Sequence, residues 1–332
     1  MGCETLLRVM MTSWGQLLSL SSSSTKLTES WRSPFIFRIS ATRKMETSPQ
    51  FMLIFAVVIS SLIAFRSYKR KSLNLSGGVA GFLVMTIHFA AGFRYGALLL
   101  VFFLTSSKLT KVGEDKKRRV DVEFKEGGQR NWKQVLCNSG IASVLVVIAS
   151  TLTGWQDKCL DSKQSEIVTA LIGGIIGHYA CCNGDTWSSE LGVLSDAQPR
   201  LITTLKPVKK GTNGGITKAG LLAAVAAGGT VGVTFLVFGL FTVRCASDVA
   251  LKQLLVIPFS ALAGLCGSLI DSVLGATIQF SGFCSVRNKV VGKPGPTVKK
   301  ISGVDILDNN GVNFVSILLT SFLTSIASVY IF

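Results

Sequence analysis

The feature that most constrains this chain is a series of long apolar stretches separated by charged connections. The stretches are 51–65, 77–103, 139–155, 167–182, 218–243, 254–280 and 312–332. A helix that crosses a membrane needs about 20 mostly apolar residues, because hydrocarbon offers the backbone no hydrogen-bond partners outside the segment. Only 16% of the 332 residues are charged, against about a quarter in an average soluble domain. The sequence therefore predicts an all-α, polytopic transmembrane helical bundle.

The stretch 77–103 decides the number of helices. It is long enough for one tilted helix, or for two short helices that turn near Gly92-Phe93-Arg94. Basic connections face the cytosol or its topological equivalent, and the first two of them flank this stretch. They share a side only if 77–103 crosses the membrane twice. We therefore predict seven to eight helices and favour eight, with both termini on the outer side. The basic connections are 66–71, 108–133, 200–210 and 287–300.

The net charge of +16 is explained by these connections. A basic balance also occurs in proteins that bind nucleic acid, but here we expect membrane lipids and no nucleic acid as partners. The eight cysteines follow no regular pairing or zinc-ligand spacing, and we interpret them as small apolar packing residues. Both histidines lie in apolar stretches, which leaves little material for a Ser-His-Asp hydrolase.

Residues 1–44 differ in composition from the rest of the chain. They are rich in Ser, Thr and Arg, and they contain only two acidic residues, Glu4 and Glu29. This composition is typical of an organelle transit segment. We expect an N-terminal extension over 1–44, disordered or used for targeting, followed by a single transmembrane domain over 45–332.

Asp271 is the most informative single residue, because it lies inside the apolar stretch 254–280. A carboxylate in a spanning helix costs about 2.5–3.5 kcal/mol on insertion scales, so it must face a cavity, pair with a cation, bind a metal or be protonated. Asp185 and Glu190 are expected at the same membrane face. We predict a shared polar cavity in which Asp185 and Asp271 are catalytic, and Asp185, Glu190 and Asp271 bind Mg²⁺. The alternative is a hydrogen-bonded network that only ties helices together.

A basic and glycine-rich connection follows the first two acids. Arg200, Lys209 and Lys210 are candidates for binding phosphates or anionic headgroups, although a plain basic connection would need no such function. Gly214 and Gly215 belong to a flexible run that offers backbone N–H groups. The run is not an ATP-binding phosphate loop, since the Gly-Lys-Ser/Thr ending is absent.

Several longer motifs resemble the transmembrane protein 19 family. They are NGDTWSSE at 183–190, GVL at 192–194, PRLI at 199–202, GTNGG at 211–215, GSLIDSVLGA at 267–276 and NNGVN at 309–313. The resemblance covers roughly residues 50–332. That family includes a plant plasma-membrane regulator of glucose-responsive growth, which this chain most resembles. It also includes a phytyl-phosphate kinase, which phosphorylates a prenyl monophosphate.

The resemblance implies a glucose-responsive growth regulator at the plasma membrane, with the plastid envelope or an endomembrane as alternatives. It also implies a prenyl-phosphate kinase that uses Mg²⁺, a nucleoside triphosphate donor and an isoprenoid phosphate substrate. In that case Asn213, Asn310 and Asn313 would orient the substrate. An ion-coupled membrane transporter is the alternative function, because an intramembrane acid such as Asp271 suits an ion path.

Overall fold

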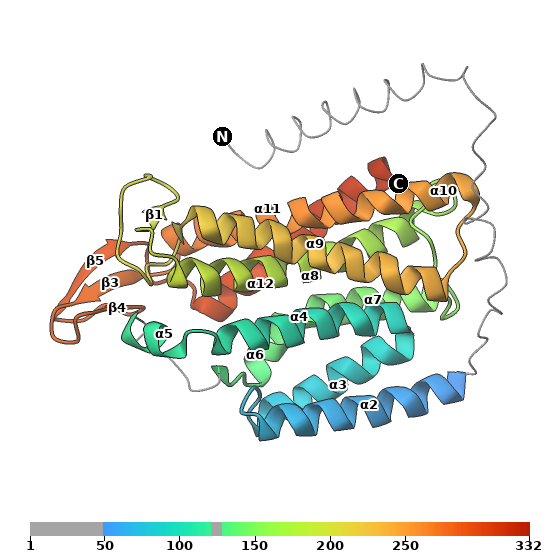
Figure 1. Ribbon diagram of the computed structural model, residues 1–332, viewed down its shortest axis with the longest axis horizontal. Coiled ribbons are helices and arrows are strands. Elements are labelled where there is room, and N and C mark those ends of the chain that lie inside the picture. The colour runs from blue at the N-terminus through green and yellow to red at the C-terminus, as the bar shows by residue number, and fades with distance from the viewer. Residues whose placement is uncertain (1–48, 121–127) are drawn as a thin grey trace, which may run out of the picture. The chain divides into compact units, whose positions relative to one another are not determined.

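The computed structural model describes residues 49–120 and 128–332, so the extension expected over 1–44 lies outside the described residues. Figure 1 shows long helices running side by side, with short strands gathered at one end. The helices are α2 (Pro49–Lys69), α3 (Leu75–Ala91), α4 (Phe93–Lys111), α5 (Glu114–Val120), α6 (Trp132–Cys137), α7 (Gly140–Leu152), α8 (Glu166–Leu194), α9 (Lys218–Thr242), α10 (Ser247–Lys252), α11 (Val256–Thr277) and α12 (Asn309–Ile331). The strands are β1 (Arg200–Leu201), β2 (Gly215–Ile216), β3 (Ser281–Cys284), β4 (Lys289–Val291) and β5 (Val298–Ser302).

Most of the long helices are able to span a membrane. Five qualify by length and composition, namely α2, α8, α9, the continuous segment from α10 through α11, and α12. α4 qualifies together with α5, which bends away from it by 76°. The shorter apolar helices α3 and α7 bring the described part of the chain to eight apolar helices. The predicted fold class, an all-α polytopic membrane protein, is confirmed.

The apolar stretch 77–103 is divided between two helices, as the distribution of basic connections predicted. α3 ends at Ala91 and α4 begins at Phe93. Gly92 lies between them with a φ of 154°, a conformation that glycine adopts without steric cost. Its N–H donates to the carbonyl of His88, so the chain reverses without losing the last hydrogen bond of α3.

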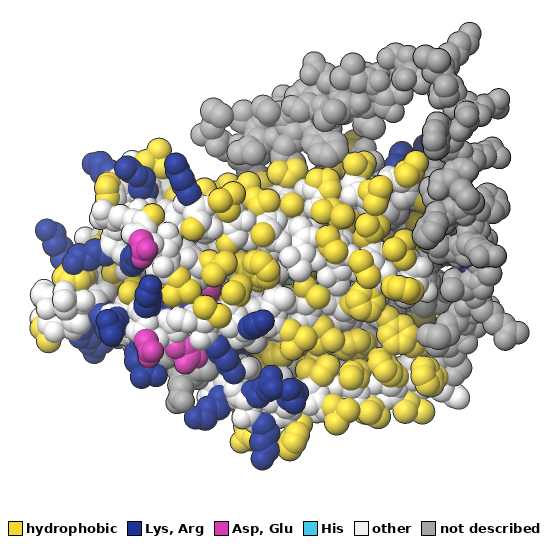
Figure 2. All heavy atoms as spheres, in the orientation of Figure 1, with side chains coloured by type: hydrophobic (Ala, Val, Ile, Leu, Met, Phe, Trp, Pro, Cys, Tyr) yellow, Lys and Arg dark blue, Asp and Glu magenta, His cyan; other side chains and the backbone are white. Residues whose placement is uncertain are grey.

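The basic connections gather at one end of the bundle. We call this the basic end, made of the described connections 70–74, 112–120, 128–139, 195–217 and 278–308; the opposite end is the outer end. Figure 2 shows most of the visible Lys and Arg side chains at the end where Figure 1 places α5 and the strands, while hydrophobic side chains cover the length of the helices. By the positive-inside rule the basic end faces the cytosol or its equivalent.

Two small antiparallel sheets at the basic end were not predicted. One pairs β1 with β2, and the other has β3 between β4 and β5. The strands lie in the long polar connections, where backbone groups that leave the helices still require hydrogen-bond partners. The sheets brace the connections that follow α8 and α11.

A disulfide at the outer end corrects the interpretation of the cysteines. Cys159, in the α7–α8 connection, is bonded to Cys245, in the α9–α10 connection. No spacing pattern in the sequence indicates this pair, because the bond joins two connections and its cysteines are 86 residues apart. Cys181 and Cys182 are buried free thiols, as expected for packing residues.

The outer end also holds a buried ion pair that sequence reasoning missed. Arg94 is 3% exposed, and its Nε lies 3.2 Å from a carboxylate oxygen of Asp157. Its guanidinium donates to the carbonyl of Lys158 at 3.0 Å and stacks 4.1 Å from the ring centre of Phe235. The hydroxyl of Thr242 also donates to Asp157. Arg94 lies inside an apolar stretch of the sequence. This position could have predicted a buried ion pair, because a charge there requires a partner.

Candidate functional site

Two acidic side chains meet where α8, α11 and α12 come together. The carboxyl groups of Asp185 on α8 and Asp271 on α11 lie close enough to interact with each other. The buried hydroxyl of Ser316 on α12 donates to Asp271 at 3.0 Å. Two bare carboxylates this close repel each other, so a cation bound between them would be favourable. The structure therefore brings together the two acids that the sequence proposed as catalytic.

Small residues allow α8 and α11 to approach closely enough for this contact. A side-chain carbon added at Gly184 would lie 2.5 Å from the carbonyl oxygen of Gly264, and one added at Gly267 would lie 2.6 Å from the sulfur of Cys181. Contacts this short admit only glycine, which lets the two backbones touch. The acid pair lies beside this crossing.

The acid pair lies in the half of the bundle nearer the basic end. α11 ends at Thr277, so Asp271 is about 9 Å below its end at 1.5 Å per residue. α8 continues to Leu194 instead of ending near residue 182, and it therefore contains the whole 183–190 motif. Both acids are partly exposed rather than sealed in the core.

The polar residues of this motif remain helical because neighbouring helices satisfy them. Asn183 donates to the carbonyl of Ala227 on α9 at 3.0 Å and accepts from Thr105 on α4 at 3.0 Å. The indole of Trp187 donates to Thr105 at 3.2 Å. Asn183 and Trp187 thus face α4 and α9, while Asp185 faces α11.

The glycine run packs directly on α11, one turn beyond Asp271. Gly214 has a φ of 74°, and a side-chain carbon there would lie 2.5 Å from the carbonyl oxygen of Ser272. Gly215 belongs to β2. The backbone N–H of Asn213 donates to Ser281 at 3.0 Å, and its amide donates to the carbonyl of Phe280 at 3.1 Å. Asn213 therefore anchors this connection to β3.

The three predicted phosphate-binding cations do not converge on the acid pair. Arg200 is exposed and donates to the carbonyl of Leu205 at 2.8 Å. The ammonium of Lys209 lies 3.3 Å from the ring centre of Phe283. Lys210 donates to carbonyls at the end of α8, among them that of Ser195. A phosphate bound by these residues would have to compete with these partners.

Two predicted asparagines lie in the first turns of α12. Asp308 caps this helix by accepting from Gly311, and Asn310 donates to Asp308 at 3.5 Å. Asn313 lies one turn before Ser316, whose hydroxyl also donates to the Asn313 carbonyl at 3.0 Å. Asn313 therefore shares a helix with the hydroxyl that holds Asp271, a partner that the sequence did not suggest.

Glu190 does not join the acid pair as a third close ligand. Its carboxylate lies 2.5 Å from the ammonium of Lys117 on α5. Among the described residues, no group of three or more Asp, Glu, His or Cys side chains is placed to hold a metal ion. Of the three expected metal ligands, only Asp185 and Asp271 remain together, because Glu190 is paired with the buried Lys117. Two carboxylates still fit Mg²⁺, which is commonly held by one or two carboxylates together with substrate phosphates.

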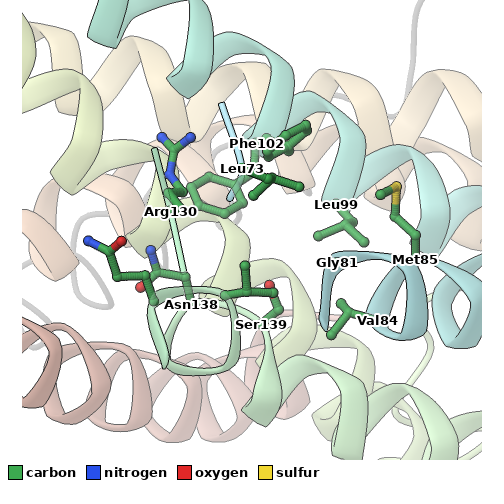
Figure 3. Close-up of a pocket in the computed structure, with 12 residues that line it drawn as sticks. Leu73, Gly81, Val84, Met85, Leu99, Phe102, Arg130, Asn138 and Ser139 are labelled. Carbon is green, nitrogen blue, oxygen red and sulfur yellow. The ribbon is translucent and has the colours of Figure 1, made fainter. Parts of the chain in front are cut away.

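A small cavity lies elsewhere, between α3, α4 and α6. Its volume is about 40 Å³, and its lining is mostly apolar. Figure 3 shows Val84 and Met85 toward one side of the group of lining residues and Arg130 toward the other. The acid pair does not line this cavity.

The two histidines behave as packed, hydrogen-bonded helix residues. His88 bonds through Nδ1 to the carbonyl of Val84 at 2.8 Å, so its Nε2 accepts from the hydroxyl of Tyr179 at 2.6 Å. His178 donates from Nε2 to the carbonyl of Asn138 at 2.9 Å. Neither contacts the acid pair, in line with the expectation for His178.

A family profile described as "Integral membrane protein DUF92" matches residues 58–321. This range contains α3 to α11 and most of α2 and α12, and it includes both acids of the pair. The chain belongs to the DUF92 family. The motifs had suggested the transmembrane protein 19 family. The profile confirms that the chain belongs to an integral membrane family, but under the description DUF92 and not under that name.

Several DUF92 relatives are similar over most of this chain. Protein PGR of Arabidopsis thaliana is 94% identical over 288 residues, which are 87% of this chain and 100% of that protein. An uncharacterized membrane protein of Methanocaldococcus jannaschii is 30% identical over 257 residues, 76% of this chain and 93% of that protein. Protein VTE6, chloroplastic, of Arabidopsis thaliana is 28% identical over 222 residues, 66% of this chain and 60% of that protein. No solved structure matches the chain.

Proposed function

We propose that this protein is a membrane kinase that phosphorylates an isoprenoid monophosphate, and that this activity underlies a role in glucose-responsive growth. One observation carries the proposal: Asp185 and Asp271, from two different spanning helices, meet within the bundle, where Ser316 donates to Asp271. Maintaining two acids in a membrane is costly, so such pairs mark functional sites. The kinase activity itself is what the family resemblance led us to expect.

The residues of the pair suit phosphoryl transfer. In this reaction an oxygen of the acceptor monophosphate forms a bond to the γ-phosphorus, and the bond to the β–γ bridging oxygen breaks to release a nucleoside diphosphate. Asp185 and Asp271 would hold Mg²⁺, and the ion would neutralise charge on the phosphates. Ser316 orients Asp271 through its hydrogen bond. The protein's task is positioning and electrostatics, so no covalent protein group is required.

The position of the pair suits an amphipathic substrate. An isoprenoid chain would remain in the hydrocarbon, while its phosphate would lie near the basic end, where both acids are within reach. The nucleoside triphosphate would approach from the aqueous side of that end. Membrane lipids and the isoprenoid phosphate are therefore the partners that we propose.

The disulfide informs the choice of membrane. Disulfides persist where one side of a membrane faces an oxidising compartment, and Cys159 and Cys245 are both at the outer end. This supports the plasma membrane, or an endomembrane with an oxidising lumen, ahead of the plastid envelope. The plastid alternative comes from the relative whose name includes the word chloroplastic.

The test is an assay of the purified full-length protein in detergent with Mg²⁺, CTP or ATP, and a series of isoprenyl monophosphates. We expect turnover by the wild type and a loss of at least about 100-fold in Asp185→Asn and Asp271→Asn, the scale of removing one charge-stabilising group. Asp305→Asn is the matched control, because Asp305 is an exposed acid at the same end and should leave turnover unchanged. Absence of turnover with every donor and acceptor would refute the kinase.

The same acid pair also favours a second function, an ion-coupled carrier. Two neighbouring carboxyl groups inside a helical bundle can bind either a proton or a metal cation, and carriers use such sites to couple transport to an ion gradient. Proteoliposomes distinguish the two functions. Cation-driven flux that Asp271→Asn abolishes, together with no phosphorylated product, would support the carrier.

A further inference from the structure

One lysine of a basic run is buried in the protein. In the run Lys116-Lys117-Arg118-Arg119 on α5, only Lys117 is buried, with 8% of its side chain exposed. Its ammonium lies 2.5 Å from Glu190 and donates to the carbonyls of Leu109 and Thr110 at 2.7 and 3.1 Å. Burying a lysine is costly unless it is paired, so this position differs from the solvated cations around it.

A second cation faces the same acid. Arg130, at the start of the segment that leads into α6, donates to the hydroxyl of Ser107 at 2.9 Å and lies 6.0 Å from the ring centre of Phe103. Burial lowers the pKa of its guanidinium from the usual value, and the attraction of Glu190 opposes that shift. Lys117 and Arg130 therefore present two partly desolvated cations to one carboxylate.

Glu190 connects this cluster to the acid pair. It is close enough to Asp185 for their charges to repel, and it lies five residues beyond Asp185 on α8. An anion held by Lys117 and Arg130 would thus lie next to the proposed Mg²⁺ position. One carboxylate facing two cations leaves a surplus positive charge, which a phosphate monoester with nearly two negative charges would neutralise better.

We propose that Lys117 and Arg130 bind the phosphate of the isoprenoid monophosphate, and that Glu190 occupies this position until the phosphate displaces it. The inference rests on the proposed kinase function, for which it names the residues that position the acceptor. Arg130 also lines the apolar cavity between α3, α4 and α6. The cavity gives the first carbons of the chain an apolar surface beside the phosphate, and the remainder of the chain lies in the membrane.

The experiment measures binding of farnesyl monophosphate to the full chain in nanodiscs, without Mg²⁺ or nucleotide. We expect Lys117→Met and Arg130→Met to weaken binding at least tenfold, and Lys117→Arg to retain it. Lys116→Met, which removes the exposed neighbour, should bind like the wild type. Glu190→Gln should tighten binding at least threefold, because it removes the competing anion and keeps both cations.

The sign of the Glu190→Gln effect separates a binding site from a purely structural ion pair. Weaker or unchanged affinity in that variant would overturn the proposal, as would full affinity in a folded Lys117→Met protein. Should Lys117→Met fail to fold, Glu190→Gln alone still decides the question. Thermal unfolding of each variant establishes that it is folded.

Two further ligands identify the source of the phosphate. Inorganic phosphate should bind more weakly than farnesyl monophosphate but with the same dependence on Lys117. Phosphatidic acid in the nanodisc should compete poorly; equal competition would mean that the site holds a bilayer headgroup and would overturn the isoprenoid assignment. The binding assay contains no Mg²⁺ or donor, so it is independent of catalysis. Binding here, together with no turnover in the detergent assay with Mg²⁺ and CTP or ATP, would refute the kinase and not this site. Turnover that is insensitive to Lys117 would refute only the site.

Discussion

Glycines at the helix crossings show how single atoms control the packing of this bundle. At Gly228 on α9 a side-chain carbon would lie 2.2 Å from the carbonyl oxygen of Ser260 on α11, and at Gly232 it would lie 2.1 Å from the Ser260 hydroxyl. A backbone atom cannot move aside as a flexible side chain can, so an added side-chain carbon would force α9 and α11 apart. The small-residue pairs recognised in the sequence are therefore packing contacts, as expected.

We predict that Gly228→Ala lowers stability by about 1–3 kcal/mol, the usual cost of overpacking. Gly78→Ala on α3 is the matched control, because no atom lies within 4 Å of its added carbon and alanine favours a helix. The measurement is thermal unfolding of both purified variants in one detergent. Equal melting temperatures for the two variants would contradict the contact.

At the scale of the elements, the outer end is held by covalent and hydrogen bonds between two connections. Besides the disulfide, the side chain of Gln253 accepts from the N–H of Leu160 at 3.1 Å and donates to its carbonyl at 2.9 Å. Leu160 is fully buried. These contacts fix the α7–α8 connection against the start of α11, above the Arg94–Asp157 pair.

We predict that Cys159→Ser lowers stability by about 2–4 kcal/mol, because the disulfide closes a long loop in the unfolded chain. A reducing agent should lower the melting temperature of the wild type by a similar amount and leave the variant unchanged. Cys137→Ser, which removes a free thiol, serves as the control. A wild type that is insensitive to reduction would count against the bond.

At the scale of the whole molecule, two independent features orient the bundle. The positive-inside rule places the basic end toward the cytosol, and the disulfide places the outer end toward an oxidising compartment. Charge distribution and redox chemistry are unrelated, so their agreement strengthens the assignment. The eight crossings predicted from the sequence would leave residues 49 and 332 on the outer side.

We predict that a tag after Phe332 is accessible to an impermeant antibody on intact cells or correctly oriented vesicles. After mild reduction, an impermeant maleimide should label Cys159 and Cys245 from the same side and should miss Cys284 at the basic end. The sequon at Asn74 should remain unglycosylated, because it lies at the basic end. Labelling of Cys284 from outside, or a tag that is reached only after permeabilisation, would reverse the orientation.

Local chemistry was sufficient to predict the helices and their approximate number, while the orientation stays a prediction. Apolar length and the placement of Lys and Arg act segment by segment, so residues such as Gly92 and the basic connections carry this information without a fold. Asp271 was recognisable for the same reason, because the cost of a carboxylate in hydrocarbon is local. Its need for a polar partner followed from the sequence, and Asp185 was among the candidates.

Which groups actually meet was decided only by tertiary packing. Ser316, Lys117 and the Cys159–Cys245 pair gave no signal in the sequence, because their partners come from elements distant along the chain. Glu190 belongs to the same motif as Asp185 but turns to Lys117, since one helix presents its residues to several different neighbours. Composition and periodicity show which kinds of partner each segment needs. The close approach of helix backbones at glycines decides which other segment provides those partners.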